Sequence, residues 1–476
     1  MADSFDRAGC LIDGDWFVPD GPVLEVIDPY TETVIGEVVD AGAQVIDAAV
    51  RSAAAAHPAW RATDVAERAA LLDRTADLLT RDADAVAGIV SREMGMPISL
   101  AQVTQAQLPA DVLRATARTA GNFPWSQDID GATLVRRGSG VIAAVTPWNM
   151  PVHQIVAKVS AALAAGSTVV LKASEMTPYD ANALAALFLE AGCPPGVFNV
   201  VTGTGAVTGS ALVAHPQLAH VSFTGSVVAG RTVASLAAQT LTRCTLELGG
   251  KSPAVVLPDA DLETALTGVV ASGLVNSGQA CNATTRLLLP QARAADATDI
   301  LKAAVAQHIL GNPADPRTRQ GPLASARQRD RVLDYIGDAV TAGGHLITGT
   351  GKPSEVSPTG FFVDPTIVTG LPEDARAIRE EIFGPVIAVQ TYTDVDDAAR
   401  IANDCAYGLS AEVWSADVDR ARALAGRLDV GQVKINGVRT RNRPTVPFGG
   451  VKDSGYGREL GHLGIEEFTD VTAVMS

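Results

Sequence analysis

Cysteine, positive charge and long apolar runs are all scarce in this sequence, and each shortage excludes a class of protein. The five cysteines are scattered, odd in number and without metal-ligand spacing. We therefore expect neither a disulfide framework nor a metal site, and a reducing cytoplasm fits best. The net charge of −16 argues against a nucleic-acid partner, because phosphate recognition needs lysine and arginine. Apolar runs are too short to cross a membrane, and the acidic first residues do not resemble a signal peptide.

The chain is long enough for two or three domains, with 476 residues of which 47% are hydrophobic. Between about residues 140 and 250, short apolar strands alternate with helices. We expect strands at 141–145, 168–172, 197–201, 219–223 and 243–248, and helices at 151–165, 178–191, 206–214 and 227–239. This alternation is typical of a doubly wound parallel sheet, in which ligands bind beyond the carboxyl ends of the strands.

A second α/β series begins near Ser252, with strands expected at 254–257, 285–289, 387–390 and 431–435. Before the first sheet, the pattern predicts a β-rich start at 11–39 and helices at 45–56 and 64–93. Residues 123–137 have no helical period and alternate weakly, which indicates a hairpin.

Two glycine-flanked stretches carry groups suited to covalent catalysis. Glu247 opens the string ELGGK, and Cys281 closes the string GQAC. A thiol becomes a strong nucleophile as the thiolate, and a nearby carboxylate can serve as general base for the thiol or for water. A free cysteine is more often a small buried hydrophobe, but the flanking motifs favour attack on a carbonyl carbon.

Glycine-rich turns at 203–209 and 225–230 follow strands and open helices, where backbone N–H groups can approach a phosphate. Neither turn matches the dinucleotide fingerprint, so a plain tight turn remains the alternative. The succession of strand–turn–helix units favours a nucleotide. Lys172 and Glu175 follow another strand end, where lysine can hold ribose or phosphate. A glutamate there can bind a ribose 2′-hydroxyl and would repel a 2′-phosphate, which favours NAD over NADP.

These stretches belong to a set of motifs that closely resembles the NAD(P)-dependent aldehyde dehydrogenase superfamily over essentially the whole chain. The matching strings are PWN at 147–149, KASE at 172–175, FTGS at 223–226, ELGGKSP at 247–253, GQAC at 278–281, EEIFGP at 380–385, YGLS at 407–410, PFGG at 447–450 and SGYGRELG at 454–461. Their order and approximate spacing agree as well, which makes the set specific.

The resemblance implies that Cys281 attacks an aldehyde to form a thiohemiacetal, which becomes a thioester when hydride leaves for the nicotinamide. It implies that Glu247 activates the water that hydrolyses the thioester. The Asn149 amide and the Cys281 backbone N–H would hold the oxyanion. Lys158 and Glu459 match a pair that relays protons from the general base.

The resemblance also implies a site for NAD, with Lys172 and Glu381 at the ribose hydroxyls and Phe383 at the nicotinamide. The other implied cofactor contacts are Thr146, Pro147, Trp148, Ser174, Glu175, Gly205, Phe223, Thr224, Gly225, Ser226, Gly230, Leu248 and Gly249.

The implied architecture has three parts, two α/β domains and one small β element. Residues 1–118 and 139–249 would form a doubly wound NAD-binding domain, and 250–446 a second α/β catalytic domain. Residues 119–138 and 447–476 would form a small β oligomerisation element with the C-terminal segment, in a homodimer or homotetramer.

Met150, His153 and Ala157 are expected to line the tunnel that admits the aldehyde. Relatives often carry Trp at the position of Ala157, or Arg where the substrate is succinate semialdehyde. A small residue there should widen the tunnel and removes that carboxylate anchor.

Arg439, Arg441 and Arg443 alternate just before the PFGG string, in a segment that lines the outer mouth of the tunnel in relatives. If the segment is extended, the three guanidinium groups point to one side, as carboxylate recognition would require. These features suggest a bulky aldehyde or one with a distal acid group. The alternative is a solvated loop that pairs with acidic residues of a neighbouring subunit.

Three other functions compete with a hydrolytic aldehyde dehydrogenase. A CoA-acylating semialdehyde dehydrogenase would usually lack a counterpart of Glu247, and a non-catalytic NAD-binding relative would be expected to have lost Cys281 or Asn149. A cysteine hydrolase would need a histidine partner for the thiol, and none of the seven histidines lies in a recognisable motif.

Overall fold

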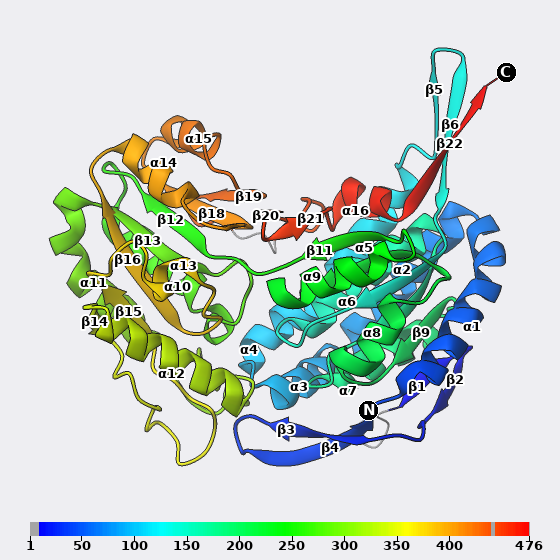
Figure 1. Ribbon diagram of the computed structural model, residues 1–476, viewed down its shortest axis with the longest axis horizontal. Coiled ribbons are helices and arrows are strands. Elements are labelled where there is room, and N and C mark those ends of the chain that lie inside the picture. Colours follow the sequence, from blue (N-terminus) through cyan, green and yellow to red (C-terminus); the bar gives the residue numbers. More distant parts are fainter. Residues whose placement is uncertain (1–8, 439–442, 476) are drawn as a thin grey trace.

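The computed structural model describes residues 9–438 and 443–475, and two large sheets with their helices make up most of it (Figure 1). The first sheet has eight strands in the order β2-β1-β9-β8-β7-β10-β11-β21. Its five central strands are parallel. They are β9 (Phe198–Val201), β8 (Thr168–Lys172), β7 (Val141–Val145), β10 (Leu218–Thr224) and β11 (Arg243–Glu247). Antiparallel strands cover both edges, namely β1 (Cys10–Ile12), β2 (Asp15–Phe17) and β21 (Gly455–Tyr456).

Helices cover both faces of this sheet, and alternate residues of β7 show it directly. Ile142 and Ala144 belong to the core under one set of helices, whereas Val141, Ala143 and Val145 belong to the core on the other face. The first set includes α2 (Val65–Arg81), α5 (Leu108–Gly121), α6 (Pro151–Ala165) and α7 (Pro178–Glu190). The second includes α1 (Gly42–Ala62), α8 (Ser210–Val213) and α9 (Val227–Ala238). The doubly wound fold is therefore confirmed.

Two expected helices differ in the structure. The helix predicted over 64–93 is two helices, α2 and α3 (Ala83–Met94), because the backbone leaves helical geometry at Asp82 (φ −101°, ψ 18°). The helix predicted over 206–214 opens with a wide π-helical turn, η3 (Gly205–Gly209), before α8. The Thr204 side chain caps this turn by accepting from the Val207 N–H.

The second sheet has seven strands in the order β14-β15-β16-β13-β12-β18-β19, all parallel except β14. The strands are β14 (His345–Thr348), β15 (Thr366–Thr369), β16 (Val386–Tyr392), β13 (Thr284–Pro290), β12 (Ser252–Val256), β18 (Ser410–Trp414) and β19 (Gln432–Ile435). On one face pack α10 (Leu262–Gly273) and α11 (Ala294–Ala306), and on the other α12 (Ala326–Thr341), α14 (Val395–Asn403) and α15 (Val418–Ala425). The chain crosses from the first sheet to this one over residues 248–251.

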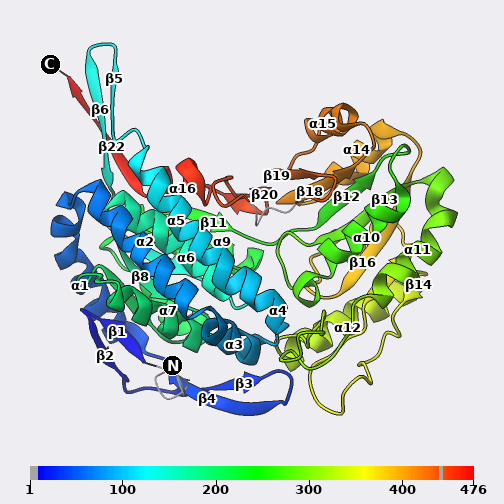
Figure 2. The same cartoon turned by 180° about the vertical axis from the view of Figure 1, so that it is seen from behind.

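A third, small sheet stands away from the body of the molecule (Figures 1 and 2). The predicted hairpin is β5 (Ser126–Ile129) and β6 (Ala132–Gly138), and the C-terminal strand β22 (Thr469–Met475) pairs along the whole of β6. In the described part of the chain, no helix is both long and apolar enough to cross a membrane.

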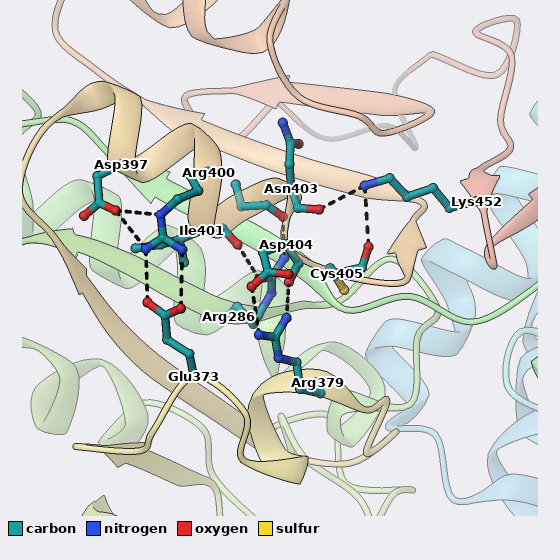
Figure 3. A network of polar contacts seen from close by, with 11 residues as sticks. Arg286, Glu373, Arg379, Asp397, Arg400, Ile401, Asn403, Asp404, Cys405 and Lys452 are labelled. Carbon is teal, nitrogen blue, oxygen red and sulfur yellow. Dashed lines mark hydrogen bonds and ion pairs between the residues drawn. The ribbon is translucent and has the colours of Figure 1, made fainter.

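A polar network fixes the end of α14 against the strand that follows Cys281 (Figure 3). The buried guanidinium group of Arg286, on β13, donates to the carbonyl oxygens of Ile401 (2.9 Å), Ala402 (2.7 Å) and Lys251 (3.0 Å). Arg379 adds a surface ion pair to Asp404 at 2.8 Å. Arg286 thus ties β13 to the crossover at 248–251.

A buried carboxyl pair joins α3 to the first turn of α7. The Glu93 carboxylate accepts from the backbone N–H groups of Tyr179 (2.8 Å) and Asp180 (3.2 Å). Burial raises the pKa of Glu93 to about 8, and burial together with Glu93 raises the pKa of Asp180 well above its usual value. This pair fixes the start of α7, which directly follows the turn that carries Glu175.

We expect the pair to make stability fall with pH in a defined window. Both folded-state pKa values are raised, so the stabilising contribution is complete below the ordinary carboxyl pKa near 4.5 and is lost as pH rises to about 8. From pH 5 to 8, the wild-type Tm should fall relative to that of Asp180→Asn by about 1 °C or more, measured by calorimetry. Parallel pH curves for the two proteins would contradict this assignment.

Candidate active site

Cys281 lies at the end of a strained turn between α10 and β13. Asn276 (φ 51°) and Ser277 (φ 57°) are both left-handed, which costs energy for residues with side chains. Gly278 (φ 73°) continues the turn, and a Cβ there would lie 2.0 Å from the Gly384 carbonyl oxygen. Hydrogen bonds hold the turn, including Ser277 Oγ to the Gly321 carbonyl at 2.8 Å. The local backbone is therefore fixed, and it sets the position of the thiol.

Asn149 is brought against this turn from the first sheet, where it follows β7. Its side-chain Nδ2 donates to the Gln279 carbonyl at 2.9 Å, and Asn276 Nδ2 donates to the Asn149 carbonyl at 2.9 Å. One amide hydrogen of Asn149 is thus used within the protein and the second remains. The sequence did not identify Asn276, because nothing in its residue type or spacing distinguishes it from an ordinary turn residue.

Glu247 ends β11 as a buried carboxylate without a hydrogen-bond partner for either oxygen among the described residues. Burial and the Glu459 carboxylate raise its pKa well above the usual value, while Lys158 and Arg458 oppose the rise. A raised pKa makes the carboxylate a stronger base, and its free lone pairs can bind a water molecule.

The thiol of Cys281 lies in the same electrostatic environment. Burial, then the carboxylates of Glu381 and Glu247, raise its pKa to about 12. The two motifs also touch through the backbone, since a Cβ at Gly250 would lie 2.5 Å from the Cys281 carbonyl oxygen. The structure therefore brings the ELGGK and GQAC strings together, as their chemistry requires.

Lys158 and Glu459 form a buried ion pair next to Glu247. The Lys158 ammonium group, on α6, contacts the Glu459 carboxylate and donates to Thr224 Oγ1 at 2.6 Å. Thr224 Oγ1 donates in turn to Gln154 Oε1 at 3.2 Å. These contacts give a continuous polar path from the interior carboxylates to the end of β10.

The predicted cofactor residues gather at the carboxyl ends of the parallel strands. Lys172 Nζ donates to the Gly203 carbonyl at 2.9 Å and lies 3.4 Å from the half-exposed Glu175 carboxylate. A small pocket is lined by Ser174, Glu175 and Gly203, at the ends of β8 and β9. Ser226 caps α9 by accepting from the Ala229 N–H at 3.2 Å.

Close packing explains three glycines of these turns. A Cβ at Gly249 would lie 2.2 Å from Glu381 Oε2, one at Gly230 would lie 2.5 Å from Leu248, and one at Gly225 would lie 2.5 Å from the Phe223 ring. At Gly205, by contrast, nothing lies within 4 Å of such a Cβ, so this turn is open to a ligand.

Trp148 and Phe383 face each other across the two sheets, with ring centroids 5.5 Å apart at 90°. Glu381, beside Phe383, accepts from the Gly250 N–H at 3.0 Å, and burial raises its pKa to about 7. Thr146 and Pro147 complete the segment between β7 and Trp148. These groups fit a dinucleotide: an open helix N-terminus suits phosphate, while Lys172 and the carboxylates suit ribose hydroxyls.

A pocket of about 190 Å³ leads from the surface to Cys281 and Asn149. Met150 and His153 line it as predicted, and burial lowers the pKa of His153 to about 4, so this ring is neutral. Of the three predicted arginines, Arg443 lines the pocket, whereas Arg439 and Arg441 lie outside the described residues.

The prediction that Ala157 lines the tunnel is wrong. It is buried one helical turn beyond His153, and only the first turn of α6 reaches the pocket, so Ala157 is not among the described lining residues. The sequence analysis missed six polar lining residues: Thr104, Gln154, Ser272, Glu412, Gln432 and Lys434. The one available signal was the lysine at position 434, inside the strand predicted at 431–435.

Comparison with known proteins agrees with this geometry. The family model of the aldehyde dehydrogenase family matches residues 16–474. A 3-succinoylsemialdehyde-pyridine dehydrogenase from a Pseudomonas species is 41% identical, over 98% of this chain and 97% of its own.

Two solved structures are similar over nearly the whole chain. Aldehyde dehydrogenase C of Pseudomonas syringae, a cysteine-to-alanine variant complexed with NAD+ and octanal, has a TM-score of 0.97 at 39% identity, covering 99% of this chain and 97% of its own. An NAD+ complex of an aldehyde dehydrogenase from Bacillus cereus has a TM-score of 0.94 at 34% identity, covering 98% and 96%. The chain belongs to the aldehyde dehydrogenase family.

Proposed function

We propose that the protein oxidises an aldehyde to the carboxylic acid with NAD, through a thioester on Cys281 that water hydrolyses with Glu247 as general base. The observation that carries the proposal is the Glu247 carboxylate. It is buried, its oxygens have no partner among the described residues, and its motif packs directly on the backbone of Cys281. A structural glutamate at this depth would be expected to have an ion pair or hydrogen bonds.

The first step is attack of the Cys281 sulfur on the aldehyde carbon. A pKa of about 12 keeps the thiol protonated at neutral pH without the cofactor. NAD, held as assigned below, would supply the hydride acceptor, and its cationic nicotinamide ring would favour the thiolate. The second amide hydrogen of Asn149, beyond the one given to the Gln279 carbonyl, and the Cys281 backbone N–H would stabilise the developing oxyanion.

Hydrolysis of the thioester needs a base that takes a proton from water. Glu247 can do so because its raised pKa brings it nearer to the operating pH. Glu459 raises the pKa of Glu247, and Lys158 lowers it. We assign to this buried ion pair the relay of the proton away from Glu247.

The dinucleotide is assigned to the turns at the ends of β8, β9 and β10. Lys172, Glu175 and Glu381 would bind ribose hydroxyls, the turn at Gly205 and the cap of α9 the phosphate groups, and Trp148 with Phe383 the nicotinamide side. Both structures compared above were solved with NAD+, which supports the same cofactor here.

A homodimer or homotetramer in the cytoplasm completes the proposal. The three-stranded sheet of β5, β6 and β22 exposes Ile129, Val471 and Val474, apolar side chains that a second copy could cover. All five cysteines are free thiols, which fits a reducing compartment.

Exchanging Glu247 should slow turnover without removing the nucleophile. Steady-state NADH formation in Glu247→Gln should fall by roughly 10² or more, the scale of a lost general base. Cys281→Ala should form no NADH and still bind NAD. The matched control Glu355→Gln, at an exposed loop position, should keep wild-type turnover. Wild-type turnover that depends on added CoA, or full activity in Glu247→Gln, would contradict the proposed chemistry.

Glu175 should set the preference for NAD. Its half-exposed carboxylate lies beside Lys172 at the ribose site, and like charge opposes a 2′-phosphate. We expect kcat/KM to be higher with NAD than with NADP. In Glu175→Gln, the ratio of the two kcat/KM values should fall by about tenfold. A wild-type preference for NADP would refute the assignment.

A further inference from the structure

One wall of the pocket carries a buried ion pair that the chemistry above does not use. Glu412 on β18 and Lys434 on β19 are register partners in neighbouring parallel strands, so their side chains leave the same face of the sheet. Lys434 Nζ lies 3.1 Å from Glu412 Oε1, and both side chains are buried while lining the pocket. β19 is the edge strand of the second sheet, beside β18 (Figure 1).

The Glu412 carboxylate is largely engaged within the protein. It accepts from Ser272 Oγ at 2.6 Å and from Trp414 Nε1 at 3.2 Å, in addition to Lys434. Burial alone would raise the pKa of Glu412, but Lys434 and Ser272 hold it below the usual value, so the group is ionised. Ser272 also contacts Thr284 at 2.9 Å, and these two residues flank the Cys281 turn. Glu412 therefore supports that turn, and three of its about four lone-pair sites are already engaged.

Lys434 is in the opposite situation. An ammonium group has three donors, and Glu412 is its one acceptor among the described residues. The unused donors border the pocket, where leaving a buried donor unpaired is costly.

Two neighbouring residues on the wall are also polar. Gln432, two residues before Lys434, has a buried side-chain Oε1, an acceptor, without a partner in the described structure. Arg443, exposed at the mouth, forms no ion pair with described residues. Among the charged lining residues, Glu412 is paired with Lys434 and Glu459 with Lys158, and His153 is neutral. Arg443 is therefore the charged lining group that has no carboxylate partner among the described residues.

We propose that Lys434 determines substrate specificity by donating a hydrogen bond to an acceptor oxygen, carboxylate or ketone, that the aldehyde carries away from its reacting carbonyl group. The inference rests on the proposed function. Arg443 adds the charge by which a carboxylate is bound more tightly than a ketone.

The test compares ω-oxo acids of increasing chain length with the alkanals and keto-aldehydes of equal length, in the full-length enzyme with NAD. The wild type should show, at one chain length, a KM for the oxygen-bearing aldehyde at least about tenfold below that for the alkanal. Lys434→Met should raise this KM by about tenfold or more and change kcat much less. Arg443→Gln should raise the KM for the ω-oxo acid and leave the KM for the keto-aldehyde nearly unchanged.

Three further variants separate recognition from structural support. Lys302→Met, the same exchange at an exposed site of α11, should leave all kinetics unchanged. Glu412→Gln removes the counter-charge and should keep or lower the KM for the acid. Lys434→Gln retains an N–H donor, so its KM for the oxygen-bearing aldehyde should lie between those of the wild type and Lys434→Met. It also serves as the test if Lys434→Met does not fold.

Specific outcomes would overturn the inference. In Lys434→Met, an equal change in KM on all substrates, or a loss of kcat on every substrate instead of a rise in KM, would contradict it. So would a wild-type enzyme without preference for any oxygen-bearing aldehyde. Oxidation of no aldehyde at all would instead refute the proposed function.

Discussion

The contact between the crossover at 248–251 and the Cys281 turn is the constraint on which the site depends. Gly250 packs so closely on the Cys281 carbonyl oxygen that no side chain fits between them. On the far side, Arg286 holds the Lys251 carbonyl from the strand that leaves the Cys281 turn. Each of its three nitrogens donates to a carbonyl group, so the cost of burying the charge is offset by hydrogen bonds. One carboxylate from the first sheet and one thiol from the second are thereby held at fixed separation.

The electrostatics of the interior follow from that arrangement. The Glu247 and Glu381 carboxylates act on the Cys281 thiol, and Glu459, paired with Lys158, acts on Glu247. Burial first, and then these neighbouring carboxylates, raise the pKa values of Glu247 and of the Cys281 thiol. These surroundings favour the protonated thiol, and the cationic nicotinamide ring of NAD would favour the thiolate.

The sequence predicted most accurately what local patterns determine. Continuous apolar runs and prolines at helix starts predicted β7, α6 and β8 with the bounds that the structure shows. Parallel strands end at one edge, and the structure accordingly brings Asn149, Lys172 and Glu247 to the same side of the sheet.

What depends on tertiary packing could not be predicted in the same way. The left-handed geometry of Asn276 and Ser277 exists because neighbouring segments hold it, not because these residue types prefer it. Lys434 and Glu412 look like solvated strand residues until the register of β18 and β19 and the cover of α10 are known. Ala157 was placed on the pocket wall by analogy of position, whereas the depth of α6 decides which turn of the helix reaches the pocket.

The central claim is that a covalent thioester forms on Cys281 and is released by water through Glu247. The most direct test is the intact mass of Glu247→Gln, quenched in acid after mixing with an aldehyde and NAD, followed by peptide mapping. The account predicts a stoichiometric adduct with the mass of the aldehyde less two hydrogen atoms, located on Cys281, which disappears much faster in the wild type. Formation of NADH without any adduct, or an adduct on another residue, would contradict it.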